Sequence, residues 1–269
     1  MSIPKAALYG SPWQAYRSQV DAPPMTLIFA LLREDHIIFA SDRRHVTGNV
    51  EERYVNDHGW KTEKILGNTA MLGFSGNDFV EQIVAPLKRQ GALEGDSLGE
   101  VARSVSKAAE QKFAAFISPV GQFPALQFLL AGFRKEGGKA LATIYKIQTG
   151  SFYPLETCYD STPGRANFEV IGKHNHGALY ALHKCAAHAT SVDAGVQLAY
   201  FTLKEITRYD NTVGGSPQIC VVRPDKELED ISDNLSTHAK WAANVGKRLQ
   251  TLIVSPIRER PRSRSKRNT

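Results

Sequence analysis

Two short apolar runs near the start of the chain, separated by a polar group, predict a β-hairpin. The runs span residues 26–32 and 37–40, and the polar group between them spans 33–36. Apolar runs of this length, bounded by turn residues, are typical of buried strands. Because hairpin strands run antiparallel, Thr26 at the head of the first strand and Asp42 after the second are expected to lie close together.

The same pattern predicts further strands. The dipeptide Gly67-Asn68 is a strong hairpin signal, and it joins two short apolar runs. The polar stretch 43–61 predicts an extended loop between the two hairpins. The expected later strands span residues 64–66, 69–74, 126–134, 140–148, a segment near 151–158, 168–171 and Gln218–Val222.

Several other segments repeat apolar residues at helical spacing. The first follows a possible N-cap at Asn77 or Asp78 and stops before Gly91. The others are expected at about 97–117, 176–189, Val192–Tyr209 and 235–254. Strands therefore alternate with pairs of helices. This order predicts an α+β fold: a four-layer αββα sandwich of two antiparallel sheets flanked by helix pairs.

Composition divides the chain into three parts. Prolines at 23 and 24 precede the first strand, so residues 1–25 are expected to be an N-terminal extension or propeptide and 26–254 the folded domain. The net charge is +6, but residues 256–269 hold six basic residues and one acidic residue. The body is therefore near neutral. The basic tail, 255–269, is either a solvated end or a segment that binds an acidic partner.

The remaining bulk properties indicate a globular protein of a reducing compartment. The apolar fraction is 42% and the charged fraction 22%, both ordinary values. Three cysteines without framework spacing argue against a disulfide scaffold and for a cytoplasmic location. No apolar run approaches the roughly 18 residues of a membrane span, and the N-terminal segment lacks the apolar core of a signal peptide.

Three polar residues are candidates for chemistry at one end of the predicted sheet. Thr26, Asp42 and Lys64 would supply a hydroxyl, a carboxylate and an ammonium there. Such residues fit a nucleophile site, but the same three types also form ordinary strand positions and surface ion pairs worth under about 1 kcal/mol. The histidines and the cysteine between 174 and 188 match no zinc spacing, so neither a metal site nor another cofactor is expected.

Three motifs, in order, are similar to the proteasome β-subunit family of N-terminal-nucleophile (Ntn) hydrolases. The first, 26–44, contains a Thr, a hairpin and an Asp-x-Arg. The second is Lys64-Ile65 followed by the Gly-containing turn 70–78, and the third is the Asp-x-x-x-Gly-Gly of 210–215. The similarity runs from about residue 26 to residue 222. It implies the αββα fold and a ring-forming subunit.

The resemblance also implies roles for individual residues. Thr26 would be the nucleophile, with its own free α-amino group as base. Lys64 would lower the pKa of the hydroxyl, and Asp42 would pair with Lys64. The backbone amide of Gly73 would stabilise the oxyanion, and Asp210 would hold the α-amino group. Two further residues, Thr47 and Met71, would contact the substrate.

Three departures from the family pattern bear on the activity. Met25 precedes Thr26, where the family usually has a Gly, so initiation at Met25 and removal of the methionine would expose the threonine. The stretch 172–176 replaces a Gly-Ser-Gly turn, leaving Lys173 or His174 as possible substitutes for its hydroxyl. Val213 stands where the family has a serine, with Thr212 one residue away.

These observations favour a threonine-type endopeptidase subunit of a proteasome-like homo-oligomeric ring. It would act on proteins or peptides, with a possible unfoldase or activator as partner and no membrane. Two alternatives stay open: a non-catalytic ring or scaffold subunit in which Thr26 remains embedded, and an Ntn amidase that acts on a small amide.

Overall fold

The computed structural model describes residues 26–48, 53–57, 59–76, 79–120, 125–172 and 176–254. The predicted N-terminal extension and basic tail lie outside these residues. Among the described residues, no helix combines the length and the apolar character needed to cross a lipid bilayer.

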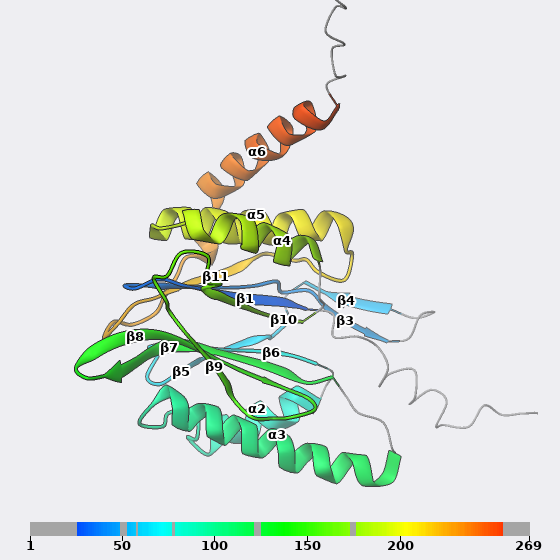
Figure 1. Ribbon diagram of the computed structural model, residues 1–269. Helices are drawn as coiled ribbons and strands as arrows, with labels where there is room; N and C mark the ends of the chain where they lie inside the picture. The colour runs from blue at the N-terminus through cyan, green and yellow to red at the C-terminus, as the bar shows by residue number, and fades with distance from the viewer. Residues whose placement is uncertain are drawn as a thin grey trace, which may run out of the picture.

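Two five-stranded antiparallel sheets form the centre of the molecule (Figure 1). The first has the order β10-β1-β2-β11-β12, and the second has the order β5-β6-β7-β8-β9. The strands of the first sheet are β1 (Leu27–Leu32), β2 (Ile37–Ser41), β10 (Phe168–Gly172), β11 (Gln218–Val222) and β12 (Glu229–Asp230). Those of the second are β5 (Thr62–Ile65), β6 (Ala70–Ser75), β7 (Gln127–Glu136), β8 (Lys139–Gln148) and β9 (Leu155–Cys158).

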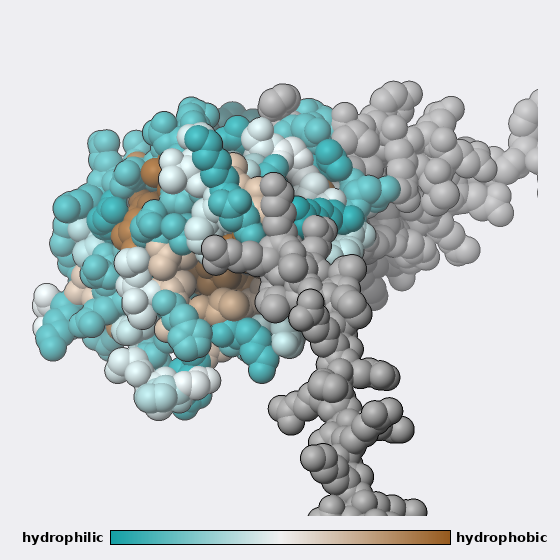
Figure 2. Space-filling model, turned by 90° about the horizontal axis from the view of Figure 1, so that it is seen from above, coloured by the Kyte–Doolittle hydropathy of each residue, from teal (hydrophilic) through white to brown (hydrophobic). Residues whose placement is uncertain are grey.

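Helices cover both outer faces of the sandwich. Helices α4 and α5 lie over the first sheet, with α6 beyond them, and α2 and α3 lie over the second (Figure 1). Their bounds are α2 (Phe79–Arg89), α3 (Leu98–Val120), α4 (His176–Cys185), α5 (Val192–Tyr209) and α6 (Ser236–Val254), with short 3-10 helices η1 (Ala186–His188) and η2 (Ser232–Asn234). Seen from the α4–α6 side, the surface is mostly hydrophilic, with smaller apolar areas (Figure 2). The predicted four-layer αββα sandwich is confirmed.

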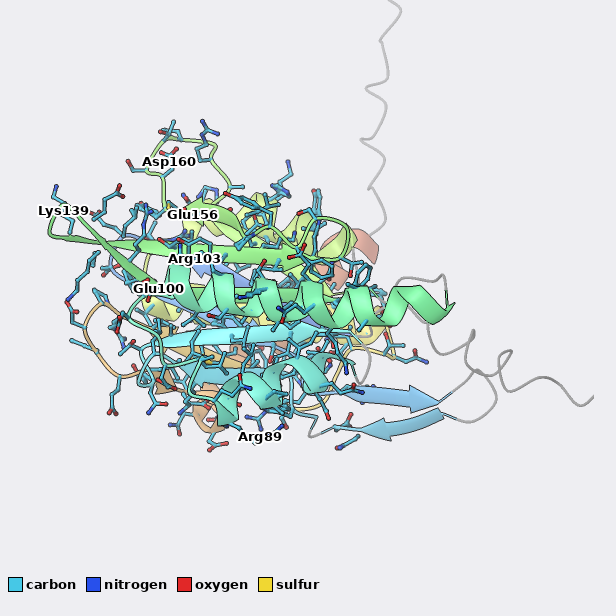
Figure 3. All side chains as sticks on the ribbon, turned by 90° about the horizontal axis from the view of Figure 1, so that it is seen from below. Arg89, Glu100, Arg103, Lys139, Glu156 and Asp160 are labelled. Carbon is cyan, nitrogen blue, oxygen red and sulfur yellow. The ribbon has the colours of Figure 1, made fainter. Side chains whose placement is uncertain are left out.

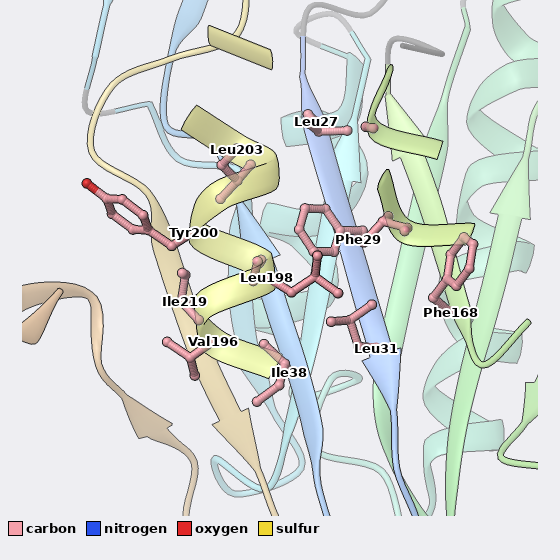
Figure 4. Packing of buried hydrophobic residues seen from close by; sticks show 14 of the residues in the cluster. Leu27, Phe29, Leu31, Ile38, Phe168, Val196, Leu198, Tyr200, Leu203 and Ile219 are labelled. Atoms are coloured by element: carbon pink, nitrogen blue, oxygen red, sulfur yellow. The ribbon is translucent and has the colours of Figure 1, made fainter. Parts of the chain in front are cut away.

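Strand β1 shows why the first apolar run has no polar alternation. Leu27, Phe29 and Leu31 face the helices in one core cluster, as Figure 4 shows for their packing near α5. The intervening residues, Ile28 and Ala30 among them, face the other sheet in a second cluster. Because both faces of the strand are covered, every side chain in it is buried, and a continuous apolar run results.

The predicted loop 43–61 is the main error in the element assignment. It contains a separate two-stranded hairpin, β3 (His45–Gly48) and β4 (Arg53–Asn56). Each of these strands has only four residues with one or two apolar positions, which is too short for a clear alternating pattern. In contrast, the predicted bounds of α5 and β11 agree with the structure, because Ser191 caps α5 and an apolar run defines β11.

Candidate active site

Asp42 is the centre of a hydrogen-bonded cluster where β1, β2 and β11 meet the following loops. Its side chain is 2% exposed. Oδ1 accepts the backbone N–H of Leu27 at 2.8 Å, and Oδ2 accepts those of Arg44 and Gly214, each at 3.2 Å. Antiparallel pairing places the end of β2 beside the start of β1, as the hairpin pattern predicted.

Lys61 is the cationic partner of Asp42. Its Nζ donates to Oδ1 at 3.0 Å and to Oδ2 at 2.9 Å, and its side chain is 5% exposed. The expectation that Lys64 would pair with Asp42 is therefore wrong. Lys64, in β5, is exposed and pairs with Met71 of β6. It lies three residues beyond Lys61, which is about 10 Å along the strand.

Thr26 lies directly beside this ion pair. Leu27 N and Lys61 Nζ donate to the same carboxylate oxygen, which places the ammonium against the 26–27 peptide. Thr26 is 5% exposed, and its carbonyl oxygen packs on Gly172 so closely that a Cβ there would be 1.9 Å away. Gly172 has a φ of +99°, and its N–H donates to Gln127 Oε1 at 2.6 Å, which joins the two sheets next to Thr26.

Asp210 lies in the loop that also supplies an amide to Asp42. Its Oδ1 accepts the N–H of Thr212 at 3.0 Å and the Oγ1 hydroxyl of Thr212 at 2.5 Å. Both side chains are buried, whereas Val213 packs into the helix-side core. Thr212, one residue before Val213, thus carries the hydroxyl that contacts Asp210, and Gly214 connects this loop to the carboxylate of Asp42.

Arg44 holds the surrounding loops together. Its Nε and Nη2 donate to Asp57 at 2.7 and 3.2 Å, and its Nη1 donates to Asn211 O at 3.0 Å. The guanidinium lies on Gly214, where a Cβ would be 2.7 Å from Arg44 Cζ. The side chain therefore fixes the position of the loop that follows Asp210.

Gly73 does not point its amide at this cluster. Phe74 N donates to Lys61 O across β5, at 3.0 Å. Because amides alternate in direction along a strand, the N–H of Gly73 faces β7. A Cβ on Gly73 would lie 2.8 Å from both Ile28 Cγ2 and Phe39 Cζ, so this glycine permits close packing of the two sheets. The predicted oxyanion role does not fit this placement.

The two predicted substrate contacts are not brought to the site either. Met71 is fully buried between the sheets, so it cannot touch a substrate without opening the core. Thr47 lies in β3 opposite Tyr54, and its side chain is outside what the structure describes. The apolar surface next to Lys61 instead comes from Trp60, which is 40% exposed and packs edge-on against Phe74.

Lys173 and His174, the possible substitutes for the hydroxyl of the Gly-Ser-Gly turn, are outside the described residues.

Burial dominates the electrostatics of the pair. It lowers the pKa of Lys61 from its ordinary value, while the charge of Asp42 opposes this shift. Burial also raises the pKa of Asp42, and the charge of Lys61 and the backbone donors act against that. A buried ion pair is weak evidence for stability because the desolvation cost is large. Perturbed groups of this kind cluster at functional sites.

No set of three or more histidine, cysteine, aspartate or glutamate side chains in the described part of the chain could hold a metal ion. The cluster brings together the hydroxyl of Thr212, the carboxylates of Asp42 and Asp210, the ammonium of Lys61 and backbone amides, all next to Thr26.

Known structures share this architecture. Anbu (ancestral beta-subunit) from Yersinia bercovieri has a TM-score of 0.67 at 15% identity, covering 88% of this chain and all of that one. Anbu from Hyphomicrobium sp. strain MC1 has a TM-score of 0.66 at 18% identity over 87% and 99%. The Anbu complex of Pseudomonas aeruginosa, a helical assembly, has 0.65 at 15% over 89% and 100%. No protein-family model and no curated relative matches the sequence.

These neighbours correct the resemblance suggested by the motifs. Anbu proteins have a proteasome-like fold but are distinct from the proteasome β-subunit family. At 15 to 18% identity, the likeness establishes the Ntn-type fold alone.

Proposed function

We propose that this chain is a subunit of an oligomeric Ntn-type hydrolase that cleaves peptide bonds with Thr26 as nucleophile. The observation that supports this most is the buried Lys61–Asp42 ion pair against the first residue of β1. A structural ion pair gains little at such a position, whereas a buried cation next to the 26–27 peptide has a use in the proposed chemistry of Thr26.

In the proposed reaction, the Oγ of Thr26 attacks the peptide carbonyl carbon and forms an ester, while its proton passes to the free α-amino group of the same residue. That proton then goes to the departing amine. The Lys61 ammonium lowers the pKa of the hydroxyl electrostatically, and Asp42 keeps the ammonium charged and in place. Water subsequently hydrolyses the ester and restores the threonine.

Two further groups complete the proposed machinery. Asp210, with Thr212 donating to it, orients the α-amino group. The oxyanion donor is proposed to be the amide of Gly76 rather than that of Gly73. Gly76 directly follows β6, two residues after Phe74, whose N–H donates to Lys61 O.

A second candidate function is a non-catalytic subunit of the same assembly. It is favoured by Met25, which leaves Thr26 without a free α-amine in the full sequence, and by the apolar Val213. A small-amide amidase is a third candidate with the same machinery. The helical assembly of the Pseudomonas aeruginosa Anbu complex supports self-assembly of this chain in either case, as a homo-oligomeric ring or a related assembly.

The test begins with untagged protein purified from its own cells, whose intact mass and N-terminal sequence are measured. A chain that begins at Thr26 should hydrolyse unstructured peptides, and the Thr26→Ala variant should not. Small amides are assayed in parallel and separate peptidase from amidase. A chain that retains residue 25 and has no turnover would support the second candidate, a non-catalytic subunit.

A further inference from the structure

A cavity lies at the opposite end of the first sheet from Thr26. It has a volume of about 370 Å³, is open to solvent on one side, and is lined by the β9–β10 loop, the end of α4 with η1, and Arg33. Arg33 follows β1, so the six residues of that strand, about 20 Å, separate it from the proposed active site. Figure 3 shows the loop that carries Asp160 projecting from the edge of the sandwich. The cavity is therefore independent of the proposed peptidase machinery.

Arg33 is a buried cation in the wall of this cavity. It is only 8% exposed. Nε donates to Ala189 O at 2.8 Å, Nη1 donates to Leu32 O at 2.5 Å, and Nη2 donates to Ala186 O. All three acceptors are neutral carbonyls, and within the described part of the chain no carboxylate forms an ion pair with the guanidinium. Burial lowers the pKa of Arg33 as a result.

The carbonyls leave the charge of Arg33 only partly compensated. Those of residues 186 and 189 lie at the end of the α4–η1 helical segment, where the helix dipole favours a cation. A guanidinium has more N–H groups than three carbonyls use, and burial of a charge is costly without a full counter-charge. An anion in the adjoining cavity would supply that counter-charge.

The rest of the lining suits a polar ligand. Arg165 contributes a second guanidinium, and its Nε lies 3.4 Å from the carboxylate of Asp160, the acidic residue of the lining. With Arg165 and Asp160 offsetting each other, the charge of Arg33 remains. The other polar residues of the lining are Tyr159, Ser161, Thr162, Asn167, His183 and Thr190.

The loop over the cavity is also pre-shaped. Asn167 Oδ1 accepts the N–H of Asp160 at 2.8 Å, and Asn167 Nδ2 donates to Asp160 O at 2.7 Å, so the two ends of the loop are tied together. Leu32 N donates to Asn167 O at 2.7 Å, which attaches this closed loop to the strand that leads into Arg33. A site built in this way loses little conformational freedom when a ligand binds.

We propose that this cavity binds a small anionic molecule, bearing a phosphate or a carboxylate group, with Arg33 as the buried counter-charge and the hydroxyls of the 161–162 loop as donors. The volume accommodates a small organic anion in addition to the charged group itself. This site would be separate from the hydrolytic centre and does not depend on catalysis.

The test is calorimetric titration of the full chain with inorganic phosphate and, separately, with citrate at fixed ionic strength. Ala187→Tyr fills the cavity from an exposed position, and Ala115→Tyr, at an exposed position of α3, is the matched control. We expect saturable binding of at least one probe, weakened at least about tenfold by Ala187→Tyr and unchanged by Ala115→Tyr. Binding of phosphate alone or citrate alone identifies the headgroup.

Two results would overturn the proposal: no saturable binding of either probe, or binding that Ala187→Tyr leaves intact. The variant Arg33→Met provides a second, independent test. If this variant folds, as judged by circular dichroism, binding should be lost while hydrolytic or assembly properties persist. If it fails to fold, the cavity-filling pair still decides the outcome.

Discussion

Lys61 Nζ lies 2.9 Å from Asp42 Oδ2, and both side chains are almost completely shielded from solvent. The same carboxylate accepts backbone amides from residues 27, 44 and 214, which come from three different parts of the chain. A single buried charge pair thus joins the start of β1, the end of β2 and the loop after α5. Loss of either charge should affect both folding and chemistry.

Substitutions at Lys61 and Lys64 test which of these two lysines acts with Asp42. In Lys61→Met, the uncompensated Asp42 carboxylate should lower the free energy of unfolding by about 3–5 kcal/mol and reduce peptide hydrolysis by more than about 100-fold. Lys64→Met, at an exposed position, should change stability by less than about 0.5 kcal/mol and leave turnover unaltered. Urea denaturation and initial rates measure both quantities.

The double variant Asp42→Asn/Lys61→Met is the control for misfolding. It removes both charges, so it should recover much of the lost stability yet stay inactive. Recovery of activity in the double variant, or equal damage from Lys64→Met, would contradict the assigned roles.

The pH dependence of hydrolysis should report the lowered pKa of Lys61. The proposed active form is the ammonium, so kcat/KM should be maximal below its folded-state pKa and fall as pH rises through it. Because burial lowers the pKa of Lys61, this fall in kcat/KM should occur below pH 10.5, the ordinary lysine pKa. In Lys61→Arg, whose guanidinium stays charged, any remaining activity should not show that alkaline fall. A profile for the lysine enzyme that stays flat to pH 10.5 would argue against a required ammonium.

Two glycines with similar backbone angles test the packing around Thr26. Gly172 and Gly164 have φ of +99° and +84°, but only at Gly172 would a Cβ collide with the chain, 1.9 Å from Thr26 O. Gly164→Ala should cost about 1–3 kcal/mol of backbone strain. Gly172→Ala should cost more than about 4 kcal/mol and abolish hydrolysis. Thermal unfolding of both variants, at matched concentration, measures the loss of stability in each. Equal losses would mean that the close packing of Gly172 on Thr26 does not contribute to stability.

The cysteines should differ sharply in thiol reactivity. Cys185 is exposed and Cys220 is buried, and burial raises the pKa of Cys220 to about 12. Because the thiolate is the reactive form, a thiol reagent at pH 8 should label Cys185 rapidly and Cys220 only after unfolding. Mass spectrometry of the labelled native chain measures this. Rapid native labelling of Cys220 would mean that β11 opens readily.

The raised pKa of Cys220 also has a consequence for stability. The unfolded thiol loses its proton at a lower pH than the folded one, so above about pH 8.5 the unfolded state is favoured increasingly. Cys220→Ala should weaken this alkaline decline, at the cost of a smaller core side chain. Unfolding midpoints measured between pH 7 and pH 10 test the sign.

The sequence by itself determined the layers and most of the elements, the β3–β4 hairpin excepted. The two-sided burial of β1, the caps of α5 and the apolar run of β11 are encoded in short stretches of chain, and their order specified the αββα sandwich. The proximity of Thr26 and Asp42 followed because both belong to one hairpin, whose register depends on a short turn.

Only the tertiary structure decided which lysine and which glycine belong to the site. Lys61 and Lys64 lie only three residues apart, just before β5 and within it, and the choice between them depends on how β5, in one sheet, is placed against β2, in the other. The same inter-sheet packing directs Gly73 inward and buries Met71. The burial of Arg33, which the sequence presented as part of a polar turn, likewise depends on helix carbonyls more than 150 residues away. Contacts between distant segments have no local pattern, because they arise from packing of the finished layers.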